Sequence, residues 1–260
     1  MVYKSHFDRL VVKDSNMLQH SFMQPYKGTL GSALEDLQKT LKETNPKSED
    51  YARMILYPPR IIRSCIDHKI AQWEDCRNVD IVKSAINLAI DVYKKPESSS
   101  ESVDEFRNRV NLANKTYMFN LPILQESDIT TWEAMHPKFS RATTNQILQR
   151  ASAKSILFVA LAHGGVAAGL DIFLRYCDLL PSGTKSDFYA VRFSRDKWKD
   201  RSMKLDSIEE AYLKNMGENR RIILFDEDIS SGTTLNYAQS SLDKIFQNKE
   251  IISVVNLIGD

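Results

Sequence analysis

Residues 220–235 have the sequence RRIILFDEDISSGTTL, and the expected fold is organised around them. The continuous apolar run at residues 222–225 predicts a strand buried on both faces, because a strand covered on one face alternates apolar and polar residues. Two carboxylates, Asp226 and Glu227, follow this run, and a turn of small hydroxyl residues surrounds Gly232. From Leu235 onward, apolar residues recur every three or four positions, which predicts a helix. The stretch therefore predicts a buried strand, an acidic pair, a hydroxyl-rich turn and a helix, in that order.

The turn and the acidic pair suit different chemical groups. A turn that leads into a helix presents backbone N–H groups and the positive end of the helix dipole, and both favour phosphate. The hydroxyl groups add hydrogen-bond donors, and Gly232 lets the backbone approach a ligand closely. Carboxylates would repel phosphate, so their expected partners are sugar hydroxyls or a hard cation such as Mg²⁺. The stretch thus predicts a site for a phosphorylated sugar. It is not a P-loop, because the Gly-Lys-Ser/Thr ending is missing.

Residues 222–235 resemble the phosphoribosyl-diphosphate (PRPP) signature of the type I phosphoribosyltransferases. The resemblance implies that Asp226 and Glu227 contact the ribose 2′- and 3′-hydroxyls, act in catalysis and hold Mg²⁺. It also implies that the 5′-phosphate is held by Ser230, Ser231, Gly232, Thr233 and Thr234. Two positions depart from the family: Asp228 replaces a usually apolar residue, and Ser230 replaces the Asp that members acting on 6-oxopurines tend to have. The alternative interpretation is an ordinary buried strand that ends in a polar turn.

A second strand and turn precede this signature. Residues 155–162, SILFVALA, predict another buried strand, and His163, Gly164 and Gly165 follow it directly. These residues resemble the family's turn that contacts pyrophosphate, with His163 in the position of a basic residue. Paired glycines permit unusual backbone angles and a close approach of N–H groups to phosphate oxygens. The alternative is a tight strand-to-helix turn without a ligand.

A basic segment follows the strand predicted at residues 188–193. In the family a mobile loop follows this strand, closes over the active site and excludes water. The resemblance therefore implies that Arg195 and Lys197 act in catalysis by supplying positive charge to the departing pyrophosphate, with Lys199 and Arg201 as further candidates. The alternative is a solvated basic loop.

Strands and helices alternate through residues 143–260. The strands predicted at residues 155–162, 188–193, 222–225 and 251–258 are separated by helical patterns, and this alternation predicts an α/β fold with a mainly parallel sheet. Ligands of such sheets bind at the carboxyl ends of the strands. The resemblance implies that this is a core of the type I phosphoribosyltransferase kind. Thr143 and Gln146 are expected to cap its first helix.

Residues 1–142 are expected to form a separate helical region. Pro58 and Pro59 are expected to open one of its helices. Cys65 and His68 lack the paired spacing of a zinc site, so no metal is expected there. The region matches no acceptor-binding domain of the family, and it is interpreted as a hood over the active site, a dimer interface or a partner-binding domain.

Composition bounds the class of protein. The chain has 260 residues, of which 42% are hydrophobic, and a formal net charge of +1, so nothing draws it globally to nucleic acid or membrane. Three widely separated cysteines indicate reduced thiols. The first residues lack the apolar core of a signal peptide, and no apolar stretch is long enough to span a bilayer. These features favour a soluble, cytoplasmic protein.

Two hypotheses about function follow. In the first, the protein is a Mg²⁺-dependent phosphoribosyltransferase that binds PRPP, transfers the phosphoribosyl group to a nitrogenous small-molecule acceptor and releases pyrophosphate; the resemblance also implies a possible homodimer. In the second, the fold has no catalytic activity and acts as a nucleotide or PRPP sensor or as an interaction module. The intact acidic pair favours the first hypothesis, since a site that binds only phosphate has no need of carboxylates. Asp228 and the helical region favour the second.

Overall fold

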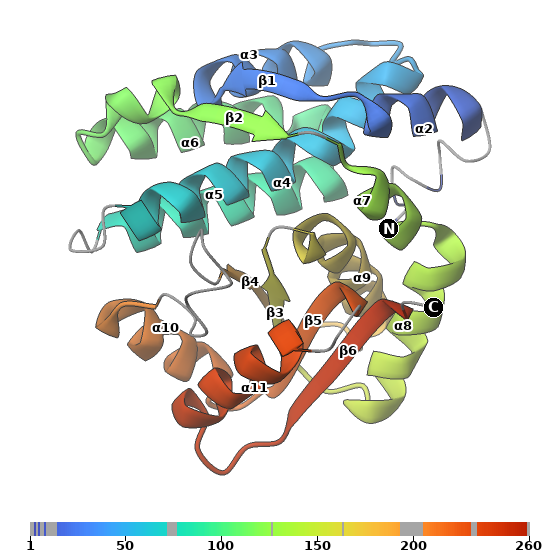
Figure 1. Cartoon of the computed structure of the whole chain (residues 1–260), viewed down its shortest axis with the longest axis vertical. Coiled ribbons are helices and arrows are strands. Elements are labelled where there is room, and N and C mark those ends of the chain that lie inside the picture. The colour runs from blue at the N-terminus through green and yellow to red at the C-terminus, as the bar shows by residue number, and fades with distance from the viewer. Residues whose placement is uncertain are drawn as a thin grey trace. The chain divides into compact units, whose positions relative to one another are not determined.

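The protein folds into two compact units, Met1–Glu133 and Ala134–Asp260. A computed structural model describes residues 3, 5, 8, 15–71, 77–125, 127–162, 164–192, 205–229 and 233–258 (Figure 1). Throughout these ranges, no helix combines the length and the apolar character needed to cross a membrane.

The second unit is built on a parallel sheet. Its strands are β3 (Ile156–Leu161), β4 (Asp187–Val191), β5 (Arg221–Ile229) and β6 (Ile251–Ile258), in the spatial order β4-β3-β5-β6. Every neighbouring pair of strands is parallel. All residues of β3 are buried, as its continuous apolar sequence predicted. The expected α/β class with a parallel sheet is therefore confirmed.

Helices cover both faces of this sheet. They are α8 (Pro137–Arg150), α9 (Gly165–Leu179), α10 (Ser207–Gly217) and α11 (Thr233–Ile245). On α9, Gly169 packs against Phe225 of β5; at the end of α10, Gly217 packs against Ile222 of the same strand. Residues three apart in a strand point to opposite faces, so α9 and α10 lie on opposite faces of the sheet. Helix α8 packs on α9, and α10 packs on α11.

Helix α8 begins earlier than its expected cap. Its N-cap is His136, and Pro137 occupies the first turn, where a missing N–H costs nothing. Thr143 lies in the middle of the helix, so the expected cap at this residue is wrong. Its buried hydroxyl instead donates a hydrogen bond to Oδ1 of Asn256 on β6. Asn256 Nδ2 in turn donates to the carbonyl of Ala134 at 2.6 Å, which ties the start of the unit to β6.

The first unit consists mostly of helices. These are α2 (Ser15–Met23), α3 (Leu30–Leu41), α4 (Ser48–Ala71), α5 (Arg77–Lys94), α6 (Ser100–Leu112) and α7 (Ile129–Ala134), with 3₁₀ turns at Pro96–Ser98 and Thr116–Asn120. Two short strands, β1 (Tyr26–Thr29) and β2 (Pro122–Gln125), pair in antiparallel fashion. These strands were not predicted, because four residues are too few to show a strand period and the partners lie far apart in the sequence.

Helix α4 passes through both prolines. Pro58 and Pro59 lie inside it, so the expectation that they open a helix is wrong. Proline lacks an N–H, so Pro59 cannot donate to the carbonyl of Ile55 four residues earlier. The hydroxyl of Tyr93 on α5 donates to that carbonyl instead, at 2.8 Å. A side chain from the neighbouring helix thus compensates for the missing backbone hydrogen bond.

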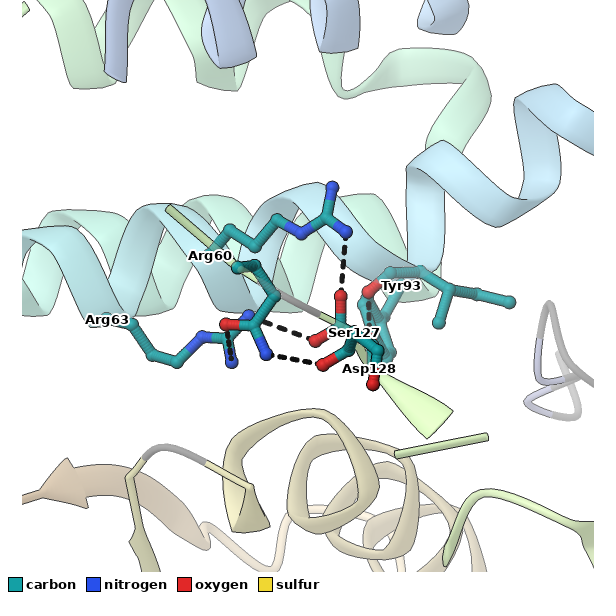
Figure 2. Close-up of polar contacts among 7 residues, drawn as sticks. Arg60, Arg63, Tyr93, Ser127 and Asp128 are labelled. Atoms are coloured by element: carbon teal, nitrogen blue, oxygen red, sulfur yellow. Dashed lines mark hydrogen bonds and ion pairs between the residues drawn. The ribbon is translucent and has the colours of Figure 1, made fainter. Parts of the chain in front are cut away.

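A buried ion cluster connects α4 to the segment after β2. Arg60 Nη2 lies 2.7 Å from one carboxylate oxygen of Asp128, and Arg63 Nη2 lies 3.4 Å from the other. Figure 2 shows the side chains of Arg60 and Arg63 directed toward Asp128. Arg60 is only 4% exposed, and its guanidinium carbon lies 4.5 Å from the centre of the Tyr26 ring. One carboxylate therefore serves two buried cations that hold these segments together.

We expect Tyr93→Phe to lower the free energy of unfolding by about 1–3 kcal/mol, because it leaves the buried Ile55 carbonyl without its donor. Chemical denaturation measures the change. Pro59→Ala restores an N–H that can reach Ile55, so it should recover stability in the Tyr93→Phe background more than in the native background. An equal effect of Pro59→Ala in both backgrounds would contradict the compensation.

Asp128→Asn should cost about 3–5 kcal/mol of unfolding free energy, because it removes the charge that neutralises buried arginines. The control is Asp80→Asn, which breaks the Lys83–Asp80 pair whose carboxylate side chain is 78% exposed. That change should cost less than about 1 kcal/mol. Similar losses of unfolding free energy in the two variants, measured by the same denaturation experiment, would show that the buried ion cluster stabilises the protein no more than an exposed ion pair does.

Candidate functional site

Those predicted site residues that the structure describes lie at the carboxyl edge of the parallel sheet. The chain leaves β3 toward β4 on one side, and β5 lies on the other side of β3. The space between the carboxyl ends of β3 and β5 is therefore the topological switch point, where open parallel sheets bind their ligands. Gly164 and Gly165 follow β3, and Asp226 and Glu227 lie on β5. Both motifs therefore flank the switch point.

Gly164 is in direct contact with Glu227. A Cβ atom placed on Gly164 would lie 1.7 Å from Oε1 of Glu227, which is far inside any allowed contact. The backbone of Gly164 has ordinary helical angles, φ −67° and ψ −51°, so a larger residue here would meet no backbone strain but would force the Glu227 side chain to move. The carboxylate of Glu227 therefore lies against the residue that precedes the first turn of α9.

Gly165 brings the same helix onto the backbone of β5. A Cβ atom there would lie 3.3 Å from the Phe225 carbonyl oxygen and 3.5 Å from the Asp226 Cα. The turn after β3 and the acidic stretch of β5 are thus packed together, as a shared ligand site requires.

The two acids of the pair lie on opposite faces of β5. The strand runs through both of them, beyond the predicted residues 222–225, because Asp226 and Asp228 continue the pairing with Val255 and Leu257 of β6. Successive side chains of a strand alternate between faces, and Glu227 points to the face of α9. Glu227 is 8% exposed. Asp226 is partly exposed, and its Oδ1 accepts a hydrogen bond from the Glu227 N–H at 2.9 Å.

The remaining predicted residues are only partly placed. Thr233 and Thr234 are the first residues of α11, directly beyond the carboxyl end of β5; Thr233 is exposed and Thr234 is partly exposed. The positions predicted at His163, Arg195, Lys197, Ser230, Ser231 and Gly232 lie outside the described residues.

The acidic pair offers few ligands for a metal. Mg²⁺ is usually bound through one or two carboxylates together with substrate phosphates and water. Asp226 and Glu227 could supply such carboxylates, and the partly exposed Asp226 is the more accessible of the two. Within the ranges that the structure describes, no three His, Cys, Asp or Glu residues lie close enough together to hold a metal. Because the two carboxylates lie on opposite faces of β5, they do not form a shared Mg²⁺ site as they stand, and Mg²⁺ binding stays a proposal.

A polar cluster that was not predicted lies beside Glu227. The pairing of β5 with β6 places Asn256 next to Glu227 on the same face of the sheet, where it joins the buried Thr143. The signal in the sequence is a single amide within the otherwise apolar stretch VVNLI of β6. Because buried polar groups need partners, Asn256 helps to fix the position of β6 beside the acidic stretch.

A second buried pair anchors the start of α10 to β4. The hydroxyl of Tyr189 donates to a carboxylate oxygen of Glu209 at 2.6 Å, and both residues are buried. Burial, and secondarily the Glu209 carboxylate, raise the pKa of Tyr189 well above its ordinary value, so the tyrosine stays protonated. Asp206 caps the same helix by accepting from the Glu209 N–H. The strand and the helix that flank the basic segment are thus tied together.

Gly164→Ala should destabilise the protein by about 1–3 kcal/mol, because the new methyl group overlaps the Glu227 carboxylate. Gly165→Ala is the matched comparison, and its looser 3.3 Å contact should cost less. Glu227→Ala should relieve most of the cost of Gly164→Ala in the double variant, as coupled neighbours do. If the losses of unfolding free energy in Gly164→Ala and Glu227→Ala simply add in the double variant, the contact between the two residues is contradicted.

No protein-family model, curated protein or solved structure matches this chain. The relationship to the phosphoribosyltransferases therefore stays a prediction from residues 222–235 and 163–165.

Proposed function

We propose that this protein is a phosphoribosyltransferase that binds PRPP with Mg²⁺ and transfers the phosphoribosyl group to a nitrogenous acceptor. One observation carries the proposal. The glycine turn after β3 and the acidic stretch of β5 come into contact at the switch point of a parallel sheet, through Gly164 and Glu227. Two motifs about 60 residues apart were each assigned to one part of the same ligand, and their juxtaposition is what a common site needs.

Each part of PRPP has a suitable partner at this edge. The diphosphate suits the backbone N–H groups of the turn at Gly164 and Gly165, at the amino end of α9. The ribose hydroxyls suit the carboxylates of Asp226 and Glu227. The 5′-phosphate suits the hydroxyl-rich turn that ends in Thr233 and Thr234 and leads into α11. The order of strand, turn and helix is that of an α/β fold with a parallel sheet, and the type I phosphoribosyltransferase kind of core is part of this proposal.

The proposed reaction exchanges one bond at the ribose C1′ for another. The bond from C1′ to the pyrophosphate oxygen breaks and its electron pair leaves with pyrophosphate. A bond from C1′ to the acceptor nitrogen forms, and the acceptor releases a proton. When bound, Mg²⁺ would neutralise charge on the diphosphate, and Arg195 and Lys197 are proposed to add positive charge. Positioning and charge complementarity with the transition state would supply most of the rate.

One feature favours the alternative of a non-catalytic sensor or interaction module. Glu227 is buried against Gly164, whereas Asp226 points to the other face of the sheet. A pair divided in this way does not present both carboxylates to one ribose unless Glu227 changes its rotamer. A sensor that binds the ligand without converting it to a product would tolerate carboxylates on opposite faces of the strand.

Calorimetric titration with PRPP, with and without Mg²⁺, tests the proposal. We expect Mg²⁺-dependent micromolar binding to the native protein and its loss in the Asp226→Asn/Glu227→Gln variant. The matched control is Asp187→Asn/Glu250→Gln, which removes two carboxylates that pair with Arg220 and Arg221 at the opposite end of the sheet. The control should bind PRPP as the native protein does.

The outcomes separate the hypotheses. Binding that survives the loss of Asp226 and Glu227 would indicate a phosphate pocket without transferase geometry. Absence of binding to the native protein would refute the transferase. Mg²⁺-dependent binding without pyrophosphate release, across a panel of nitrogenous acceptors, would favour the sensor.

A further inference from the structure

We propose that Glu227 competes internally with the diphosphate for the turn after β3, and that this competition lets the site prefer PRPP over free pyrophosphate. The inference rests on the proposed function and assigns to Glu227 a role in specificity that contact with a ribose hydroxyl does not imply. In this role the carboxylate occupies the place of a phosphate oxygen until a ligand draws it away.

The Glu227 carboxylate lies beside the amino end of α9. It is 8% exposed and lies directly on Gly164, the N-cap residue of α9. Gly164 offers no side chain to cap the helix, so the amino end of α9 depends on other groups for negative charge. A helix amino terminus stabilises an adjacent carboxylate in the same way that it stabilises phosphate.

The space around the turn makes the two anions exclusive. On the side of β5, the residues after β3 contact the Phe225 carbonyl oxygen, the Asp226 Cα and the Glu227 carboxylate. The first two are backbone atoms that are fixed by the pairing of β5 with β6. A diphosphate oxygen that approaches Gly164 from this side must therefore displace the Glu227 side chain, because the three atoms nearest to a Cβ at Gly164 all belong to it.

The cost of displacement differs between the two ligands. With PRPP, the displaced carboxylate gains the ribose hydroxyls as new partners under the proposed function. Pyrophosphate brings no hydroxyl, so the same carboxylate leaves the helix terminus for no new partner and stays close to a second anion. Glu227 should therefore weaken pyrophosphate selectively, which favours release of this product.

Asp226 provides the matched control. It carries the same charge and is adjacent in the sequence, but its side chain lies on the other face of β5, whereas the atoms nearest to a Cβ at Gly164 all belong to Glu227. If negative charge weakened pyrophosphate binding in a general way, removing either carboxylate would change the affinity for pyrophosphate by a similar factor. Competition at the turn would be confined to Glu227.

The experiment is a calorimetric titration of inorganic pyrophosphate, in the absence of divalent cations, into the native protein, Glu227→Gln, Glu227→Ala and Asp226→Asn. Removing the like charge at the turn should tighten pyrophosphate binding about tenfold in both Glu227 variants, and by less than about twofold in Asp226→Asn. Glu227→Gln preserves the size of the side chain, so Glu227→Ala shows whether bulk adds to charge. Thermal unfolding of each variant checks that it is folded.

Affinity for PRPP with Mg²⁺, measured on the same proteins, completes the test. Glu227→Gln should lower the ratio of PRPP affinity to pyrophosphate affinity. Unchanged or weaker pyrophosphate binding in folded Glu227 variants would overturn the competition, as would an equal gain in Asp226→Asn or no pyrophosphate binding to any variant. If the native protein fails to bind PRPP while Glu227→Gln still tightens pyrophosphate, the transferase fails but competition at Gly164 stands.

Discussion

The close approach of α9 to the sheet is the constraint on which the second unit depends. Gly164, Gly165 and Gly169 all face β5 or β3 at distances where a Cβ atom would be crowded. Along this line the helix packs on strand backbone, on Ala160 and on the rings of Phe158 and Phe225. The same packing fixes the turn after β3 against the acidic stretch of β5. The candidate site is thus assembled by the core itself, and its geometry inherits the rigidity of the sheet.

Local signals in the sequence were sufficient for much of the second unit. The continuous apolar runs at residues 155–162 and 222–225 predicted β3 and the first part of β5, and the strand predicted at residues 251–258 is β6. The parallel order followed from the alternation of strands and helices. Each of these signals depends only on residues that are close together in the sequence.

The features that the sequence did not predict depend on residues that are far apart in the chain. The extension of β5 through its acids comes from pairing with β6, and this extension sets Asp226 and Glu227 on opposite faces. Thr143 resembles a cap in the sequence, yet its partner is Asn256, more than a hundred residues away. In the first unit, β1 and β2 are too short to recognise without each other. The sequence therefore nominated candidate residues for a site, but it could not predict the unequal environments of the two carboxylates.

The prolines of α4 carry a consequence for how the first unit folds. An isolated segment with Pro58 and Pro59 would break before Pro58, because an interior proline removes a hydrogen bond and crowds the preceding turn. Its continuity depends on a hydroxyl from α5. Helix α4 is therefore not an autonomous element that forms first and docks later. Its two halves should join only as α5 arrives, so that secondary and tertiary structure in this part of the chain form in one cooperative step.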